Sequence, residues 1–323
     1  VISLSELRDQ KPTASRTTIA AWVTYDTGNT VFFTGIVGLA FPLWITTVMG
    51  GNDATIGFTL AAAMAIVFFM APVLGTLSDH LGKRMIFLIL FTLLSISSTV
   101  LIGVGGMALS LVLFVIGVTA IHTADIFYNA LLEVVSSRDN RGTIAGIGIG
   151  LGYIGSVIAV ITTSLFVGPL GYVFVIRVLS VIILILTGPL LIIGRDRPSR
   201  ARVDKTSPVL LVSFTVQRIV EAARTARNHR AWARFLVARF WYMWATNAAA
   251  SFAVLYAVQT VGLSESQVLV LLLTGMTAAI PSGVFWGRLV DKHGPFNILK
   301  TAVGGWFIVL ATAALIPVLG LTA

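Results

Sequence analysis

The sequence predicts an all-α polytopic membrane protein, and three observations support this fold class. Of the 323 residues, 57% are hydrophobic and only 11% are charged, and the charged residues stand in short clusters between long apolar runs. An ordinary soluble domain carries about 25% charged residues, and about 20 consecutive apolar residues are enough for a helix to cross a bilayer. A soluble globular fold is therefore excluded.

The apolar runs, and the charged clusters that separate them, predict nine transmembrane helices. Read in chain order, they cover residues 19–48, 54–77, 85–103, 107–134, 143–167, 172–194, 232–261, 266–289 and 297–320. The first six form a predicted N-terminal six-helix bundle over residues 19–194, preceded by a cytoplasmic arm, residues 1–18. The last three form a C-terminal bundle over residues 232–323.

A basic linker, residues 195–231, joins the two predicted bundles. It opens with a basic stretch that contains Pro198 and Pro208, and from Val209 onward apolar residues recur on one helical face. This pattern predicts an amphipathic helix that lies on the membrane surface.

Lysine and arginine gather in alternate loops, whereas the turns at residues 50–53 and 103–106 contain neither. Because basic loops stay in the cytoplasm, we expect a cytoplasmic N-terminus in a multi-pass protein of the cell (inner) membrane. The net charge of +9 then reflects loops beside anionic lipid and not nucleic-acid binding. Arg177 is the exception: snorkelling to the outer interface accounts for it, and a counter-ion role is the alternative.

One sequence pattern occurs twice. Gly75-x-Leu77-x-Asp79-x-x-Gly82 recurs as Gly287-x-Leu289-x-Asp291-x-x-Gly294, each copy at the inner end of the second helix of its bundle. Parallel repeats joined by a central cytoplasmic loop are typical of one class of secondary transporter.

This repeat, with Lys83 and Arg84 after its first copy, resembles the loop signature of the major facilitator superfamily. Residues 21–30 and 127–132 are similar to its vacuole effluxer-like (autophagy-related amino-acid effluxer) branch, although Glu133 stands where that branch usually has proline. The resemblance implies a major facilitator-type fold of twelve helices, so we expect the three-helix C-terminal bundle to be incomplete, apparently truncated.

The resemblance also implies that both copies of the repeat act as conformational latches. The latch residues are Gly75, Asp79, Gly82, Arg84, Gly287, Asp291 and Gly294. Asp79 can accept hydrogen bonds from a helix N-terminus or pair with Arg84, and Asp291 is expected to face the start of the fifth helix near Gly142. A turn that only sets the topology is the alternative.

Polar residues inside the first and fourth predicted helices form a candidate substrate and proton site. Trp22, Tyr25, Asp26 and Asn29 follow the spacing of one helical face, and His122, Asp125 and Asn129 follow that of another. A carboxylate at mid-membrane costs about 2.5–3.5 kcal/mol on insertion scales, so the two acids should face protein or water.

In the superfamily these two helices line a central cavity, so we expect Tyr25, Asp26, Asn29, His122, Asp125 and Asn129 to converge. Asp26 or Asp125 would carry a coupling proton or hold a substrate amine, and the neutral side chains would supply hydrogen bonds. The alternative is that they cap or cross-link helices without touching substrate. Residues of the seventh helix resemble those of the first and could line the opposite wall of the cavity, but an aromatic belt or core packing is the favoured interpretation; these residues are Trp241, Tyr242, Thr246 and Asn247.

Other chemistries lack the residues that they need. The chain contains no cysteine, which excludes disulfides and thiolate metal sites. His122 and Asp125 would supply only half of a metal shell, so we expect no metal and no cofactor. Gly150-x-Gly152-x-x-Gly155 matches a dinucleotide-binding pattern, but it lies in an apolar run without a preceding strand and is assigned to helix packing.

The sequence therefore predicts a secondary active transporter of a small solute, an amino acid or similar metabolite, which works by alternating access with proton coupling. We expect no enzyme activity, because the four histidines are scattered. A membrane scaffold or sensor derived from a transporter fold and a small-molecule or drug exporter are the alternatives. The expected partners are a small-molecule solute, the proton and membrane lipid; the chain is expected to be a monomer if completed and otherwise an oligomer.

Overall fold

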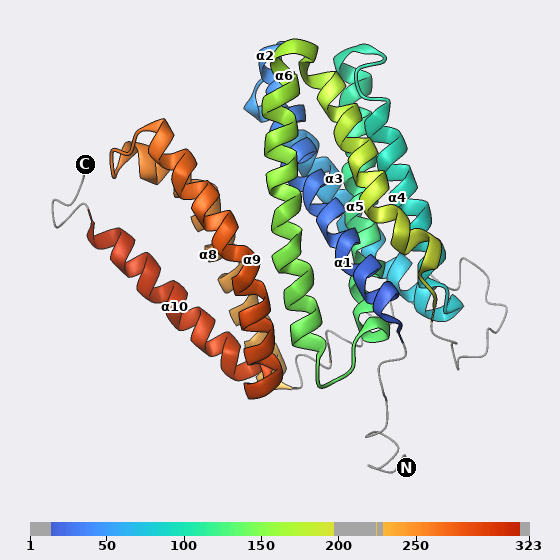
Figure 1. Cartoon of the computed structure of the whole chain (residues 1–323), viewed down its shortest axis with the longest axis vertical. Coiled ribbons are helices and arrows are strands. Elements are labelled where there is room, and N and C mark those ends of the chain that lie inside the picture. Colours follow the sequence, from blue (N-terminus) through green and yellow to red (C-terminus); the bar gives the residue numbers. More distant parts are fainter. Residues whose placement is uncertain (1–13, 197–223, 225–228, 317–323) are drawn as a thin grey trace. The chain divides into compact units, whose positions relative to one another are not determined.

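The computed structural model describes residues 14–196, 224 and 229–316, and every regular element among them is helical. In chain order the elements are α1 (Arg16–Val31), η1 (Phe32–Ala40), α2 (Phe41–Thr47), α3 (Asp53–Leu81), α4 (Arg84–Val100), α5 (Gly106–Val135), α6 (Arg141–Ile193), α8 (Arg230–Gln259), α9 (Glu265–His293) and α10 (Pro295–Leu315) (Figure 1). The predicted amphipathic helix of the linker and most of the N-terminal arm lie outside the described residues.

The chain divides into two compact units. The first contains α1 to α6 together with residues 279–291 of α9, and the second contains α8, the remainder of α9 and α10. The helix α9 therefore contributes residues to both units.

Among the described residues, six helical segments are long and apolar enough to cross a membrane. They are Arg16–Thr47, Asp53–Ser78, Gly106–Val135, Arg141–Ile193, Val270–His293 and Pro295–Leu315. These segments support the prediction of a multi-pass helical membrane protein, whereas the grouping into six plus three helices stays a prediction. The helix α4 is apolar but shorter.

The long helix α6 consists of two rods. Its 53 residues would extend about 80 Å, far more than the ~30 Å of a hydrocarbon core. Gly171, with φ 77° and ψ 170°, interrupts the helical backbone where the sequence predicts a turn between two helices. A positive φ is strained for any residue with a Cβ, so glycine is needed at this break.

The first apolar segment differs from the single helix that the sequence predicts. Ser15 caps α1 by accepting the Thr18 N–H at 3.2 Å, but Phe32–Ala40 forms a π-helix before the α-helix resumes in α2. Pro42 has no N–H to donate, and the Phe41 N–H bonds to the carbonyl of Ile36, five residues back. Such π segments are frequent at functional sites.

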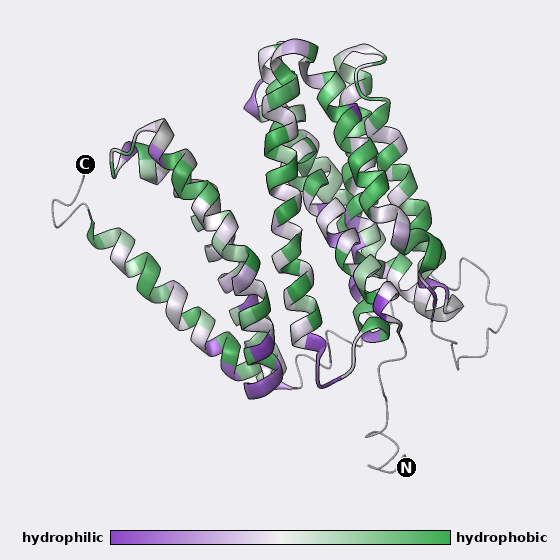
Figure 2. Ribbon diagram, in the orientation of Figure 1, coloured by the Kyte–Doolittle hydropathy of each residue, from purple (hydrophilic) through white to green (hydrophobic). Residues whose placement is uncertain are grey.

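The first unit has two buried clusters of side chains. One surrounds Phe41 and Phe114, whose rings stack with centroids 3.8 Å apart; the other surrounds Trp22, Tyr25 and Tyr128. Large apolar side chains also lie on its outer surface, as a lipid-facing protein requires, and Figure 2 shows hydrophobic residues along much of the long helix α6.

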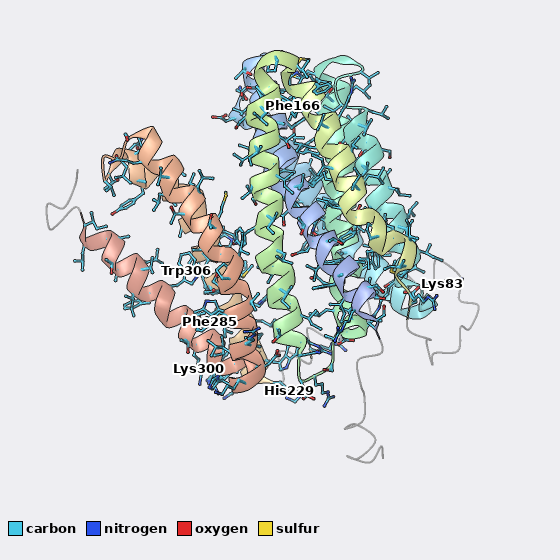
Figure 3. The ribbon with its side chains drawn as sticks, viewed as in Figure 1. Lys83, Phe166, His229, Phe285, Lys300 and Trp306 are labelled. Carbon is cyan, nitrogen blue, oxygen red and sulfur yellow. The ribbon has the colours of Figure 1, made fainter. Side chains whose placement is uncertain are left out.

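The start of α4, at one end of the first unit, is capped by a residue that follows α6. Lys83, in the turn between α3 and α4, lies at the end opposite to Phe166, which is near the break in α6 (Figure 3). At the Lys83 end, Asp196 accepts the N–H of Met85 at 2.9 Å. Since Lys83 supplies no side-chain cap for α4, this aspartate after α6 caps α4 from a distant part of the chain.

A hydrogen bond joins two helices of the second unit. The Tyr256 hydroxyl of α8 donates to the carbonyl of Ala313 in α10. Gly294, with φ 83°, allows the sharp turn from α9 into α10, and the Lys300 ammonium lies 4.6 Å from the centroid of the Phe296 ring.

Candidate functional site

The candidate site lies where α1 meets α5. The Asn29 side-chain N–H donates to Asp125 Oδ1 at 2.6 Å and joins the two helices directly. Asp26 stands ten residues after the start of α1, and Asp125 ten residues before the end of α5. At 1.5 Å per residue, both acids lie about 15 Å from those helix ends, so they are at similar depth.

The side-chain oxygen of Asn29 has no hydrogen-bond partner among the described residues. Its side chain is 8% exposed, and Oδ1 is buried without a partner among the described residues. A buried amide oxygen with no donor is costly, and buried polar groups of this kind are usually satisfied by water or by a ligand. The unpaired atom accepts hydrogen bonds, which suits a protonated ligand group or water.

A stack of three aromatic rings fixes the register of α1 against α5. The Tyr128 ring lies between those of Trp22 and Tyr25, with centroids 4.7 Å and 4.8 Å away. Tyr128 donates its hydroxyl to the Trp22 carbonyl at 3.2 Å, and the Trp22 indole N–H donates to the Tyr128 carbonyl at 3.3 Å. This packing places Asp26 and Asn29 at a defined height beside α5.

Tyr25 bonds to a side chain of α4. Its ring is fully buried, and its hydroxyl is 2.8 Å from the hydroxyl of Thr92 in α4. In this conformation Tyr25 therefore joins α1 to α4.

The carboxylate of Asp26 faces a strip of glycines on α6. A Cβ added at Gly152 would lie 3.1 Å from Asp26 Oδ2 and 3.1 Å from the Thr30 hydroxyl, and one at Gly148 would lie 2.9 Å from the Trp22 ring. The hydroxyl of Thr27 donates to the Leu151 carbonyl at 3.3 Å. These glycines leave room for Asp26 between α1 and α6.

The remaining candidates lie on α5. His122 is half-buried, with its ring 4.8 Å from that of Phe33 in η1. Asn129 is exposed. Its side-chain N–H donates, at 2.8 Å, to the backbone carbonyl of Asp125, which lies one turn earlier on the same helix. The structure thus brings Asn29 and Asp125 into contact and places His122 and Asn129 on either side of Asp125 along α5.

Sequence reasoning missed Thr92 and did not single out Tyr128. Thr92 stands alone among apolar neighbours, and nothing in the sequence shows that it meets Tyr25. Tyr128 falls within the branch-like stretch, but its contacts with α1 depend on which helices are adjacent. Within the described residues, no group of three or more histidine, cysteine, aspartate or glutamate side chains could hold a metal ion.

The second copy of the repeat reaches the start of α6. Asp291 Oδ1 accepts the N–H of Gly142 at 2.6 Å, and Oδ2 accepts the N–H of Thr143 at 2.7 Å and its hydroxyl at 2.6 Å. The first N–H groups of a helix have no partner within the helix and carry partial positive charge. The carboxylate therefore caps α6.

Close backbone packing accompanies this cap. A Cβ added at Gly142 would lie 2.6 Å from the Gly287 carbonyl oxygen, and one at Gly150 would lie 2.5 Å from the Ile280 carbonyl oxygen. A Cβ at Gly146 would overlap the carbonyl oxygen of Gly283. Glycines four residues apart on α6 therefore face α9, whereas Gly148 and Gly152 face α1.

The first copy is described in part. Gly82 ends α3 in the left-handed conformation with φ 63°, and a Cβ at Gly75 would meet open space. The Arg84 guanidinium donates to the carbonyl of Ala130 in α5 at 3.3 Å. The side chain of Asp79 lies outside the described residues.

Comparison with known proteins shows the family to which the chain belongs. The family model of the Major Facilitator Superfamily matches residues 28–323. An uncharacterized MFS-type transporter, YxiO, of Bacillus subtilis (strain 168) is 25% identical over 312 residues, which cover 91% of this chain and 72% of the relative. An uncharacterized protein of Aquifex aeolicus (strain VF5) is 27% identical over 299 residues, which cover 89% of this chain and 69% of the relative. No solved structure matches the chain.

Proposed function

Because the chain belongs to the major facilitator superfamily, we propose that it is a secondary transporter that moves a small solute across the membrane by alternating access. The superfamily match, the apolar helices and the name of the Bacillus relative support transport over enzymatic activity. On the stretches 21–30 and 127–132 we propose the vacuole effluxer-like branch, with an amino acid or a similar metabolite as the solute.

The contact between Asn29 and Asp125, with Asp26 at similar depth, is the observation that carries this proposal. Carboxylates inside a membrane-spanning bundle are costly, and in transporters they mark ion and substrate pathways. Asp26 or Asp125 takes up the coupling proton or neutralises the ammonium group of the solute. Asn29 orients the Asp125 carboxylate and offers its free oxygen to the same ligand.

We also propose that Asp291 forms a conformational latch, which holds α9 on the start of α6 in one state and releases it in another. Three hydrogen bonds to one carboxylate support this role. The corresponding role for Gly75, Asp79, Gly82 and Arg84 rests on the sequence repeat, and Gly287 and Gly294 accompany Asp291 in the second copy.

The proposed membrane is the cell membrane, with a cytoplasmic N-terminus. A single cysteine at the exposed Ser15, introduced into this chain without cysteines, tests the orientation. An impermeant thiol reagent should label it in inverted membrane vesicles and not in intact cells. Labelling in intact cells would reverse the topology.

Transport is tested with the full-length protein in proteoliposomes. Uptake and efflux of a panel of labelled amino acids, organic acids, sugars and organic cations are measured with and without an imposed pH gradient. Accumulation that depends on the gradient is the expected result. If no solute moves under any condition, the chain is not a transporter of these classes, and a membrane scaffold or sensor replaces the proposal.

The two acids are tested in the same assay. Asp26→Asn and Asp125→Asn should each abolish gradient-driven accumulation, because asparagine cannot exchange a proton or neutralise an ammonium group. Asp53→Asn, at the exposed start of α3, is the matched control and should transport normally. Unchanged accumulation in both site variants would remove these carboxylates from the mechanism.

A further inference from the structure

Basic side chains gather at one end of the second unit, where α8 begins and α9 turns into α10. Four of them are exposed and are called the basic patch below: Arg230 and Arg234 in the first two turns of α8, Lys292 in the last turn of α9, and Lys300 near the start of α10. His229, which precedes α8, and Lys300 lie at the same end of this unit (Figure 3).

The connections of the three helices also bring these residues to one end. A short turn joins α8 to α9, and Gly294 alone separates α9 from α10, so α8 and α10 both run antiparallel to α9 and begin at the end where α9 finishes. The Tyr256 hydroxyl, near the end of α8, donates to the carbonyl of Ala313, near the end of α10. This bond agrees with a common direction for the two helices.

The basic patch has no acidic counterpart in its unit. Among the described residues of the second unit the single acid is Glu265, which begins α9 and therefore lies at the opposite end of that helix. The first turns of α8 and α10 contain no acid. Asp291, next to Lys292, accepts three hydrogen bonds from the start of α6. In the described part of the chain, Arg230, Arg234 and Lys292 form no ion pair.

Two arginines at the predicted cytoplasmic end of the first unit, by contrast, contact other groups of the protein. Arg141 Nη1 is 3.9 Å from Glu133 Oε1, and Arg84 donates to the carbonyl of Ala130. The linker before α8 does not supply the missing negative charge either, because residues 197–228 contain seven lysines and arginines and only two acids. The basic patch therefore suits an anion from outside the chain.

Exposed aromatic side chains accompany the basic patch. Trp232 is 64% exposed and Phe296 60%, and the Lys300 ammonium lies 4.6 Å from the centroid of the Phe296 ring. Aromatic residues are enriched at the level of the lipid headgroups, and long basic side chains at helix ends extend their charged groups to the same level. Together they match a membrane surface that carries negative charge.

We propose that the basic patch binds the headgroup phosphates of anionic phospholipids in the leaflet on the predicted cytoplasmic side. Basic pockets between membrane helices on this side bind anionic headgroups, and each lysine or arginine near an anionic surface strengthens the attraction about fivefold. The proposal goes beyond transport, because it names the lipid that contacts the second unit and holds for any transported solute.

The absence of cysteine from the sequence allows a fluorophore to be placed beside the basic patch. Asn297→Cys, at an exposed position one turn before Lys300, is labelled with bimane in the full-length protein. The protein is reconstituted into phosphatidylcholine vesicles with increasing amounts of a spin-labelled lipid, either phosphatidylglycerol or phosphatidylcholine, whose nitroxide quenches the fluorophore on contact. The ratio of the two association constants measures the preference for anionic lipid. Val258→Cys, 41% exposed near the end of α8, supplies the control position.

We expect a preference for phosphatidylglycerol at position 297 and none at position 258. Arg230→Gln combined with Arg234→Gln should lower the preference at position 297 at least fivefold, since two of the four charges are lost. Arg230→Lys combined with Arg234→Lys keeps both charges and should retain most of the preference. Arg177→Gln, which removes an exposed arginine from the first unit, should leave it unchanged. Raising the salt concentration from about 0.05 M to about 0.5 M should also reduce the preference, because salt screens exposed charges.

Equal quenching by the two lipids at position 297 would overturn the inference. A preference that survives the two glutamine substitutions would do the same, and so would one that the lysine and glutamine substitutions reduce equally, because charge would then not be its cause. The measurement needs no transported solute, so its failure and the failure of the proposed transport function are observed separately.

Discussion

Replacing Asp291 by alanine should destabilise the contact between α9 and α6 more than any neighbouring surface change. The substitution removes the acceptor of three hydrogen bonds, from the Gly142 N–H, the Thr143 N–H and the Thr143 hydroxyl, at 2.6 to 2.7 Å. It also removes a negative charge from the N-terminus of a long helix, where such a charge is favourable.

The magnitude follows from these contacts. Loss of a helix N-cap costs about 0.5–2 kcal/mol, and hydrogen bonds to a charged group are worth about 1.5–3 kcal/mol each. The contributions overlap, and the freed groups are only partly buried and regain water, so we expect a loss of about 3 kcal/mol. At roughly 2 °C per kcal/mol for a chain of this size, the midpoint of unfolding falls by about 6 °C.

The assay is thermal unfolding of the purified protein in detergent, followed by intrinsic tryptophan fluorescence. Asp291→Asn keeps one carbonyl acceptor and should lose about half as much stability as the alanine variant. Lys292→Ala, an exposed side chain on the adjacent residue, is the matched control and should change the midpoint by less than about 1 °C. Equal midpoints for Asp291→Ala and Lys292→Ala would refute the cap as a source of stability.

Other substitutions test the remaining contacts of the first unit by the same unfolding assay. Gly146→Ala should destabilise the protein by about 2 kcal/mol, because the added methyl group overlaps the Gly283 carbonyl. Gly188→Ala, on the same helix, is the control: its methyl group meets no atom within 4 Å, so the change should be neutral or slightly stabilising. Equal effects of the two substitutions would mean that α6 and α9 do not pack backbone to backbone. Tyr25→Phe combined with Thr92→Val should give a coupling energy of about 1 kcal/mol in a double-mutant cycle, and additive effects would show that the two hydroxyls do not pair. Asp196→Ala should cost about 1 kcal/mol through loss of the cap at Met85, and an unchanged midpoint would show that the cap contributes nothing.

Much of the architecture could be predicted from local patterns. Apolar runs between charged clusters predict membrane helices because only a helix satisfies its own backbone in lipid, and the apolar helices and the superfamily match confirm a helical multi-pass protein. The similar depth of Asp26 and Asp125 also followed from counting residues along two helices. The position of Asp291 opposite the start of α6 was expected from the repeat, and its role as a latch stays a prediction.

Other features could not be predicted, because they depend on which helices are neighbours. The sequence shows a run of alternating glycines in α6, but not that Gly146 faces α9 while Gly152 leaves room for Asp26. It predicts a single helix over residues 19–48, whereas Phe32–Ala40 is a π-helix.

The sequence by itself predicts which segments are apolar enough to cross a membrane and how far each carboxylate lies from the end of its helix, since both depend on composition and on a constant rise per residue. Only the tertiary structure decided that Asn29 bonds Asp125, that Tyr25 turns to Thr92 and that Asp196 caps α4. Each of these contacts joins residues far apart in the chain, and it is set by how the side chains of whole helices pack together.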